Sequence, residues 1–202
     1  MSTVASSRVA YLPAPGNREV FANVDAPVFS ADDCDLILSR LREERWVPAG
    51  VADDGHRGSI RPEVRSVLSQ PVPLASSHPL CQRLLAVVAA ANDRYWRLDL
   101  TGFPDGDAPS VLRYESAVAD HFACHVDAGP QFSSRKLSFS VQLTDPRDYR
   151  GGDLLFPGNN AIATRERGNV TVFSALVPHE VTPVLSGERF ALVGWVHGPV
   201  FR

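Results

Sequence analysis

The sequence predicts a mostly β protein with supporting helices, and three observations lead to this fold class. From Leu98 onward, short stretches rich in strand-forming residues alternate with Gly, Pro and Asn turns, which is typical of a barrel or sandwich, including the jelly roll. Two segments of the first half have helical spacing instead. The length of 202 residues and the hydrophobic content of 44% fit one domain with a good-sized core. We therefore expect one domain over 1–202, with helical support and lead-in strands in 1–97 and a jelly-roll core in 98–202.

The first half opens with an irregular, proline-containing lead-in that holds one expected strand near Val20–Val24. Ser30 then provides a suitable N-cap, and acidic residues follow in the first turn, where the helix dipole favours them. Apolar residues at helical spacing predict a helix over about 31–45. A second helix is predicted from Pro79, a favoured first-turn residue, to about Trp96. Its long apolar run indicates a helix buried against a sheet.

The second half is expected to consist of short strands separated by turns. The predicted strands are Ser110–Tyr114, Ala119–Cys124, Lys136–Leu143, Asp153–Phe156, Ala161–Arg165, Val170–Phe173, Glu180–Val184 and Arg189–Val196. In the strand over 136–143, apolar and polar residues alternate strictly, which usually places the core on one face and solvent on the other. The polar face of this strand consists of Ser138, Ser140 and Gln142.

The composition excludes several classes of function. A net charge of −3 without basic clusters gives no electrostatic reason to expect nucleic acid or an anionic membrane as a partner. The three cysteines are odd in number and widely spaced, so neither a disulfide framework nor a zinc motif is indicated. No apolar run reaches the ~18 residues of a membrane span, and the first residues lack the apolar core of a signal peptide. The expected setting is a reducing cytoplasm.

A candidate metal site begins with His125 and Asp127, a His-x-Asp pair at the end of a predicted strand. Side chains repeat every second residue along a strand, so both would point to the same side. With the distant His179 they would form a face of two histidines and one carboxylate, the ligand set that holds non-haem Fe(II) and leaves positions open for oxygen and a co-substrate. Arg189, ten residues after His179, is a permanent cation whose planar fork suits a carboxylate. Iron with a carboxylate clamp indicates 2-oxoglutarate-dependent oxidation.

A His-x-Asp pair alone is a weak signal, because short motifs often arise by chance and an isolated histidine is more often a surface or core residue than a ligand. Further motifs follow it in order: the strand over 135–144, the turn before Asp153–Phe156, Gly168–Ser174, Pro178–Pro183 and Gly187–Trp195. This order resembles the prolyl 4-hydroxylase-like branch of the 2-oxoglutarate and Fe(II)-dependent dioxygenases, most closely its small bacterial members. The resemblance covers about residues 109–197, with weaker similarity around Arg65-Ser66.

The resemblance implies a double-stranded β-helix, which is a cupin-like jelly-roll barrel with supporting helices on one face. It also implies that the triad holds Fe(II), that Arg189 binds the distal carboxylate of 2-oxoglutarate, and that O2 is the third reactant, with ascorbate as a further candidate cofactor. In this family the strand matching 136–143 borders the 2-oxoglutarate pocket. Its polar face would therefore look into the cavity, where Gln142 would donate to the distal carboxylate and Ser140 would line the pocket.

Four neighbouring residues have weaker expectations. Tyr114 lies slightly further before the His-x-Asp pair than the tyrosine that often hydrogen-bonds the co-substrate in the family, and the alternative is a buried tyrosine whose hydroxyl meets backbone. His121, four residues before His125, would share that residue's side of the strand in a supporting or substrate-facing role. Cys124 would point away from the iron. Trp195, on the same side of its strand as Arg189, is expected to form the hydrophobic back wall of the pocket.

Residues 51–62 are rich in turn formers and charges, which favours a flexible surface loop. The family counterpart of this segment lies near the mouth of the active site. His56, Arg61 and Arg65 are therefore candidate substrate contacts.

The expected activity is hydroxylation of an unactivated C–H bond in an amino acid, a peptide or a related small molecule, with release of succinate and CO2. An intact Asp127 favours hydroxylation over halogenation, because halogenating relatives have a small residue at this position; desaturation and ring closure stay open. The alternatives are a hydroxylase of a prolyl or other residue in a protein, and a non-catalytic metal-binding jelly-roll sensor. A cupin-like isomerase is a further alternative, which Arg189 disfavours. The short chain favours a small molecule or a short peptide segment as substrate.

Overall fold

The computed structural model describes residues 21–23, 27–53, 56–72, 75, 77–104 and 106–200. Its first helix, α1 (Ala31–Ser39), begins at the predicted cap. The Ser30 hydroxyl accepts a hydrogen bond from the backbone N–H of Asp33 at 3.1 Å, and the Asp33 carboxylate accepts one from the Ser30 N–H at 3.0 Å. This capping box satisfies two N–H groups that the helix leaves unpaired. The second helix, α2 (Pro79–Tyr95), matches its prediction closely.

The prediction of one helix over 31–45 was wrong at its C-terminal end. α1 stops at Ser39, and only a short 3₁₀ turn, η1 (Glu43–Arg45), follows. The buried side chain of Gln70 pairs with the backbone of Arg42 at both groups: its amide oxygen accepts from the Arg42 N–H and its NH₂ donates to the Arg42 carbonyl, each at 2.8 Å. This long-range pairing holds Arg42 in an extended conformation, so the helix cannot continue.

The strands form two large antiparallel sheets and two short two-stranded ribbons. The seven-stranded sheet has the order β1 (Phe21–Asn23), β13 (Val170–Ser174), β9 (Arg135–Gln142), β16 (Glu188–His197), β7 (Ser110–Glu115), β6 (Leu68–Pro71) and β2 (Val47–Pro48). The five-stranded sheet has the order β12 (Ala161–Ile162), β11 (Leu154–Phe156), β14 (His179–Val181), β8 (His121–His125) and β5 (Arg65–Ser66). The ribbons pair β3 (Val51–Asp53) with β4 (His56–Ser59), and β10 (Arg150–Gly151) with β15 (Val184–Ser186).

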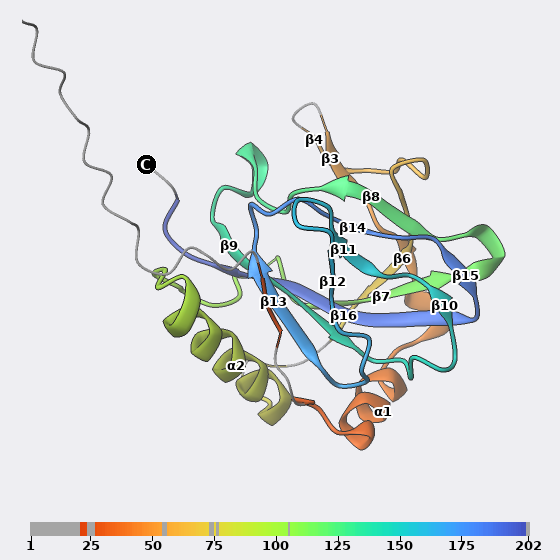
Figure 1. The fold of residues 1–202 in the computed structure, drawn as a ribbon, viewed down its shortest axis with the longest axis horizontal. Helices are drawn as coiled ribbons and strands as arrows, with labels where there is room; N and C mark the ends of the chain where they lie inside the picture. The colour runs from red at the N-terminus through yellow and green to blue at the C-terminus, as the bar shows by residue number, and fades with distance from the viewer. Residues whose placement is uncertain are drawn as a thin grey trace, which may run out of the picture.

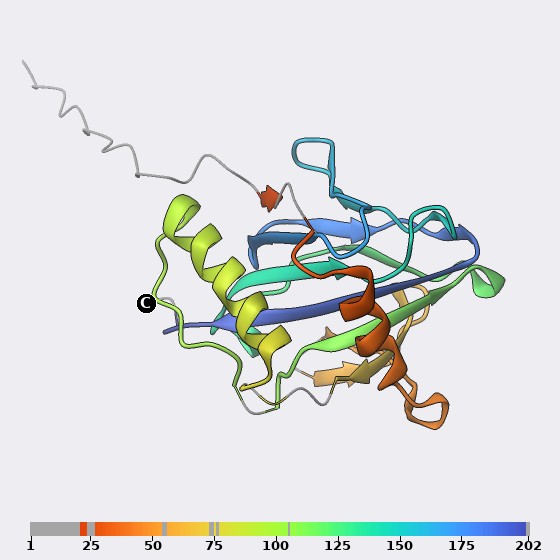
Figure 2. The ribbon, with the colours of Figure 1, turned by 90° about the horizontal axis from the view of Figure 1, so that it is seen from below.

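The two large sheets are the walls of a jelly roll, which confirms the predicted fold class (Figure 1). Both helices lie on the outer side of the seven-stranded sheet (Figure 2). Their buried residues, among them Ile37 and Leu84, form one core with the apolar face of β9, Leu137 to Val141. A second core lies between the sheets and includes Leu112 and Phe156. The polar face of β9 is therefore also buried, and it faces the space between the sheets rather than solvent.

The remaining differences from the predicted elements lie at strand ends and in the lead-in. The segment 51–62, predicted as a flexible loop, contains the paired strands β3 and β4, although residues 54–55 lie outside the described part. The strand predicted over Glu180–Val184 is divided into β14 and β15, because Pro183 has no N–H to continue a ladder and the two parts pair with different strands. First-half strands join both sheets: β1, β2 and β6 extend the larger and β5 the smaller. Neither described helix has the length and apolarity needed to cross a membrane.

Candidate active site

Sheet register brings the three predicted metal ligands together. His125 ends β8 and His179 begins β14, and the antiparallel pairing places these two residues directly opposite each other. Asp127 follows in the turn after β8. Its backbone N–H and that of Ala128 both donate to the carbonyl of Ala175 at 2.9 Å. The two sequence-distant parts of the triad therefore meet at one end of the small sheet.

A β-bulge in β8 changes which neighbours share the side of His125. Pairing advances two residues along β14, from Val181 to His179, while β8 advances three, from Phe122 to His125. The extra residue reverses the alternation, so Phe122 and not His121 lies beside His125, and the centroids of the two stacked rings are 3.4 Å apart. The expectation that His121 faces the site was wrong, because its ring contacts the backbone carbonyls of Ala119 and Glu63. Cys124 is exposed, as predicted.

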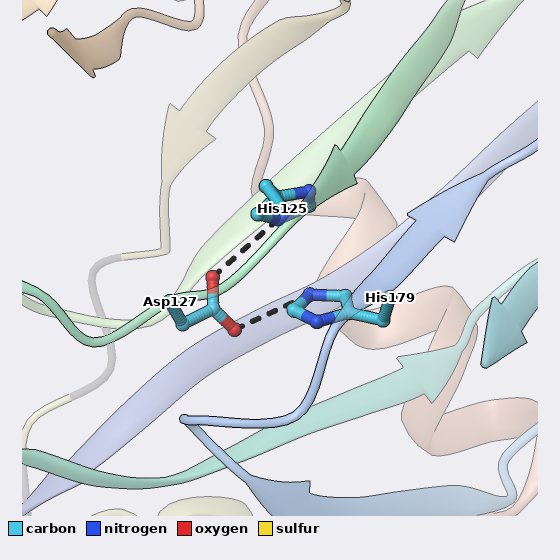
Figure 3. Close-up of side chains that lie close together, drawn as sticks. All are labelled: His125, Asp127 and His179. Carbon is cyan, nitrogen blue, oxygen red and sulfur yellow. Dashed lines mark ion pairs between the residues drawn. The ribbon is translucent and has the colours of Figure 1, made fainter. Parts of the chain in front are cut away.

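The triad has the geometry of a metal centre (Figure 3). Nε2 of His125 lies 3.6 Å from one carboxylate oxygen of Asp127, and Nε2 of His179 lies 3.4 Å from the other. One candidate ligand atom from each residue lies within 4.8 Å of the other two. A small divalent cation placed among these atoms would contact all three side chains.

Hydrogen bonds at the other ring nitrogens fix the orientation of both histidines. Nδ1 of His125 lies 2.8 Å from the carbonyl of Ala123, and Nδ1 of His179 lies 2.9 Å from the carbonyl of Val177. A carbonyl oxygen only accepts, so each Nδ1 carries the proton and each Nε2 presents its lone pair to the centre of the triad. Two neutral imidazoles and one carboxylate with such supporting partners fit Fe(II).

Two further side chains hold Asp127. The hydroxyl of Ser138 donates to the carboxylate oxygen Oδ2 at 2.6 Å, and Arg135 donates to the backbone carbonyl at 3.3 Å. Arg135 is itself held by a two-point hydrogen bond to Asp107, with both contacts at 2.8 Å. The carboxylate of Asp107 also accepts a hydrogen bond from Nε2 of His197 at 2.9 Å. This chain of contacts restrains the loop that carries Asp127 from the side of the large sheet.

The electrostatics of the triad favour the protonation states that a metal requires. Burial acts to raise the pKa of Asp127, but the neighbouring imidazoles of His125 and His179 and the hydrogen bond from the Ser138 hydroxyl lower it well below its usual range. Burial lowers the pKa of His179 despite the nearby Asp127 charge. Near neutral pH the site therefore holds an ionised carboxylate and a neutral His179.

Arg189 lies deep in the cavity between the sheets. Its side chain is 2% exposed, and one guanidinium N–H donates to the amide oxygen of Gln142 at 2.9 Å. Its Nε is buried without a partner, and no ion pair with a carboxylate is found for it among the described residues. A buried guanidinium without a counter-charge is costly, so the site is suited to an anionic ligand. Arg189 and the metal triad line the same inner pocket.

Three predicted pocket residues surround this guanidinium. Gln142 uses its carbonyl oxygen on Arg189 and donates its NH₂ to the hydroxyl of Ser140 at 3.2 Å. Gln142 therefore orients the arginine, because a guanidinium can only donate and takes the amide oxygen as its acceptor. The sequence predicted instead that Gln142 would donate to the distal carboxylate of 2-oxoglutarate. Tyr114 pairs with Arg189 across β7 and β16 and is 1% exposed. Burial raises the pKa of its phenol, while the hydrogen-bonded Arg189 and the nearby Arg65 oppose the shift.

The sequence predicted that Trp195 forms the back wall of the pocket, whereas in the structure it lies at the mouth of the inner pocket. It shares the inward side of β16 with Arg189, but it pairs with Ser138, whose hydroxyl contacts Asp127, at the end of the strand nearer the triad. Its ring is covered by the guanidinium of Arg135, with Cζ 3.5 Å from the ring centroid. The residue also lines two outer hollows of about 410 and 400 Å³, and the first of these is bordered by His125 and Asp127.

Two of the three candidate substrate contacts line the larger hollow. Arg61 and Arg65 both do so, and Arg65 also lines the inner pocket and the second hollow. The side chain of His56 lies outside the described residues. Sequence reasoning assigned no role to Phe122, to Arg135 or to Asp107. The polar face of β9 pointed to Ser138 as a cavity residue, whereas no local pattern indicated the contact between Asp107 and Arg135.

Comparisons with known proteins agree with this geometry. Residues 109–197 match the family model of the 2OG-Fe(II) oxygenase superfamily. A PKHD-type hydroxylase of Maricaulis maris is 36% identical over 95 residues, which are 46% of this chain and 42% of that protein. A PKHD-type hydroxylase of Shewanella baltica is 28% identical over 184 residues, covering 86% of this chain and 76% of that protein. The matched part of this chain thus spans less than half the length of the Maricaulis protein.

The fold has a counterpart among solved structures. A prolyl-4-hydroxylase of Pseudomonas putida superposes with a TM-score of 0.66 at 21% identity, covering 90% of this chain and 94% of the other. At that identity the likeness concerns the fold alone. The matched residues include the whole triad and Arg189, so this part of the chain is similar to the 2OG-Fe(II) oxygenase superfamily, and the predicted resemblance to prolyl 4-hydroxylase-like enzymes is confirmed.

Proposed function

We propose that this protein is a 2-oxoglutarate and Fe(II)-dependent hydroxylase of an amino acid, a peptide or a related small molecule. The observation that carries the proposal is one pocket lined by two kinds of unsatisfied group. At one end stand a carboxylate and two Nε2 lone pairs, and at the other stands a buried guanidinium without a carboxylate partner among the described residues. 2-Oxoglutarate is matched to both, because it carries a chelating 2-oxo acid at one end and a second carboxylate at the other.

Each residue has a defined task in this proposal. His125, Asp127 and His179 hold Fe(II) on one face, and Arg189 fixes the far carboxylate of 2-oxoglutarate. When bound, Fe(II), 2-oxoglutarate and O2 together supply the oxidising power for C–H hydroxylation, with succinate and CO2 as co-products. The protein contributes orientation: Ser138 restrains the carboxylate ligand, Gln142 and Ser140 set the guanidinium plane, and Tyr114 packs beside it.

A prolyl or other residue within a protein is the second candidate substrate, and the shape of the surface beside the triad favours it. The two outer hollows share Gly50, Arg65 and Trp195 in their walls, so they adjoin each other, and one of them is also lined by His125 and Asp127. Hollows of this combined size could take an extended peptide. The prolyl-4-hydroxylase named above, with the same fold, is consistent with this alternative.

The first experiment tests cofactor use separately from the substrate. Anaerobic addition of Fe(II) and 2-oxoglutarate should give the weak visible charge-transfer band of the chelate, and Asp127→Ala should abolish it. A succinate-release screen with ascorbate present, over free amino acids and prolyl peptides, then identifies the substrate class. A protein that gives the band but releases no succinate above background with any substrate would be a metal-binding sensor. Absence of the band would contradict the cofactor assignment itself.

A further inference from the structure

Arg65 stands where the inner pocket and the two outer hollows meet. It belongs to β5, which pairs with β8, and its partner in that pairing is Phe122. Its guanidinium carbon lies 4.4 Å from the centroid of the Phe122 ring, and the same ring stacks on the ligand His125 at 3.4 Å. One aromatic ring therefore connects the guanidinium to a metal ligand, next to the space where a substrate must lie.

Among the described residues, the charge of Arg65 is offset only at a distance, by the carboxylate of Asp127, whereas the other arginines around the outer hollows form ion pairs. Arg61 forms an ion pair with Glu63 at 2.8 Å, and Arg135 forms one with Asp107 at 2.8 Å. No ion pair with a carboxylate is found for Arg65 in the described part of the chain. Arg189, the one other arginine of the inner pocket, also forms no ion pair with a carboxylate among the described residues. The proposed function assigns an anionic ligand to Arg189.

The contacts that Arg65 does make hold the side chain in place without neutralising it. One terminal N–H donates to the carbonyl of Gly50 at 2.9 Å, and the ring of Phe122 supports the guanidinium plane. Its Nε is buried and has no hydrogen-bond partner. A buried donor left unpaired costs free energy that an incoming acceptor would recover. A carboxylate is the acceptor that satisfies a guanidinium both in charge and in two-point geometry.

We infer that Arg65 binds a carboxylate of the substrate, so that the compound hydroxylated at the triad is an acid and not its neutral amide. The inference rests on the proposed function, because it assumes that the reacting molecule lies over the metal. It narrows the substrate class to free amino acids, N-acylated amino acids, or peptides whose acidic group lies close to the reacting carbon. Position also separates this role from that of Arg189, which lies deeper and is oriented by Gln142.

The test measures binding under conditions in which the co-substrate sites are already filled. Anaerobic protein loaded with Fe(II) and 2-oxoglutarate is titrated calorimetrically with N-acetyl amino acids and with the matching amides, beginning with N-acetyl-L-proline and N-acetyl-L-prolinamide. The wild type should bind the acid about tenfold more tightly than the amide, the lower end of the range for a charge pair, since Arg65 is only half-buried. Arg65→Gln should remove the preference, and Arg65→Lys should keep part of it because the charge survives.

Two controls separate this role from others. Arg45→Gln removes one positive charge from the exposed η1 turn and should leave the preference unchanged. The visible band of the Fe(II) and 2-oxoglutarate complex should persist in Arg65→Gln, and thermal unfolding should show that this variant is folded. Equal binding of acid and amide by the wild type, a preference that persists in Arg65→Gln, or no binding of any acid in the panel up to millimolar concentration would overturn the inference. Loss of the band in the wild type would instead contradict the proposed function.

Discussion

Replacement of Arg189 by alanine tests the co-substrate assignment most directly. The side chain is 2% exposed and is not paired with a carboxylate among the described residues, so solvent screening would weaken its attraction for a bound anion very little. If its guanidinium holds the distal carboxylate of 2-oxoglutarate, truncation leaves that carboxylate buried and unpaired. Such a loss costs roughly 2–5 kcal/mol, which is about 30- to several-thousand-fold in affinity. Arg189→Lys should recover part of the loss, because charge remains but the two-point fork does not.

The assay is the apparent 2-oxoglutarate constant of the wild type and the two variants, measured from the visible band of the anaerobic iron complex and from succinate release. Iron affinity should barely change, because Arg189 contacts Gln142 and Tyr114 and not the triad. A rise of less than fivefold in the alanine variant would mean that Arg189 is a structural residue and that the clamp lies elsewhere. A parallel loss of iron binding would point to general damage of the pocket, which thermal unfolding of the variant without ligands would reveal.

Three further predictions concern the metal triad, the hydrogen bond from Ser138 and the three cysteines. Alanine at any member of the metal triad should abolish turnover and weaken Fe(II) binding while the fold persists; near-normal activity in one variant would remove that residue from the ligand set. Ser138→Ala removes a hydrogen bond to the carboxylate of Asp127 and should weaken iron binding or activity about 10- to 100-fold, whereas a change below twofold in an Fe(II) titration would contradict its positioning role. Burial raises the pKa of the Cys34 thiol to about 11 and also raises that of Cys81, so near pH 8 both stay protonated and covered. Ellman's reagent should therefore titrate one thiol per native protein, that of exposed Cys124, and three thiols after denaturation. More than one reactive thiol in the native protein would show that the core opens.

The sequence was most informative where a pattern is local. The N-cap at Ser30, the proline in the first turn of α2 and the alternation of β9 each depend on neighbours along the chain, and the structure contains all three. The metal ligands were also predictable, because a His-x-Asp pair with a distant histidine and an arginine at a fixed offset is a chemical pattern that survives without coordinates. Their roles as iron and 2-oxoglutarate ligands remain predictions for the experiments above.

Register and long-range pairing decided the rest. Alternation along an isolated strand predicts that His121 faces the same side as His125, but the bulge forms only when β8 pairs with β14, and it places Phe122 there instead. Likewise, nothing near residue 45 indicates that α1 must stop early, because the cause is the side chain of Gln70.

The site likewise combines features that depend on local sequence pattern with features that depend on long-range pairing. The sequence by itself determined which chemistry-bearing side chains exist and in what order, since these depend on residue type and spacing. Only the tertiary structure decided which of them face the cavity, that Trp195 lies at its mouth, and that Arg65 and Arg189 are the two pocket guanidiniums without a carboxylate partner among the described residues. The physical reason is that a charge becomes functional through what surrounds it, and those neighbours come from distant strands whose pairing no local pattern specifies.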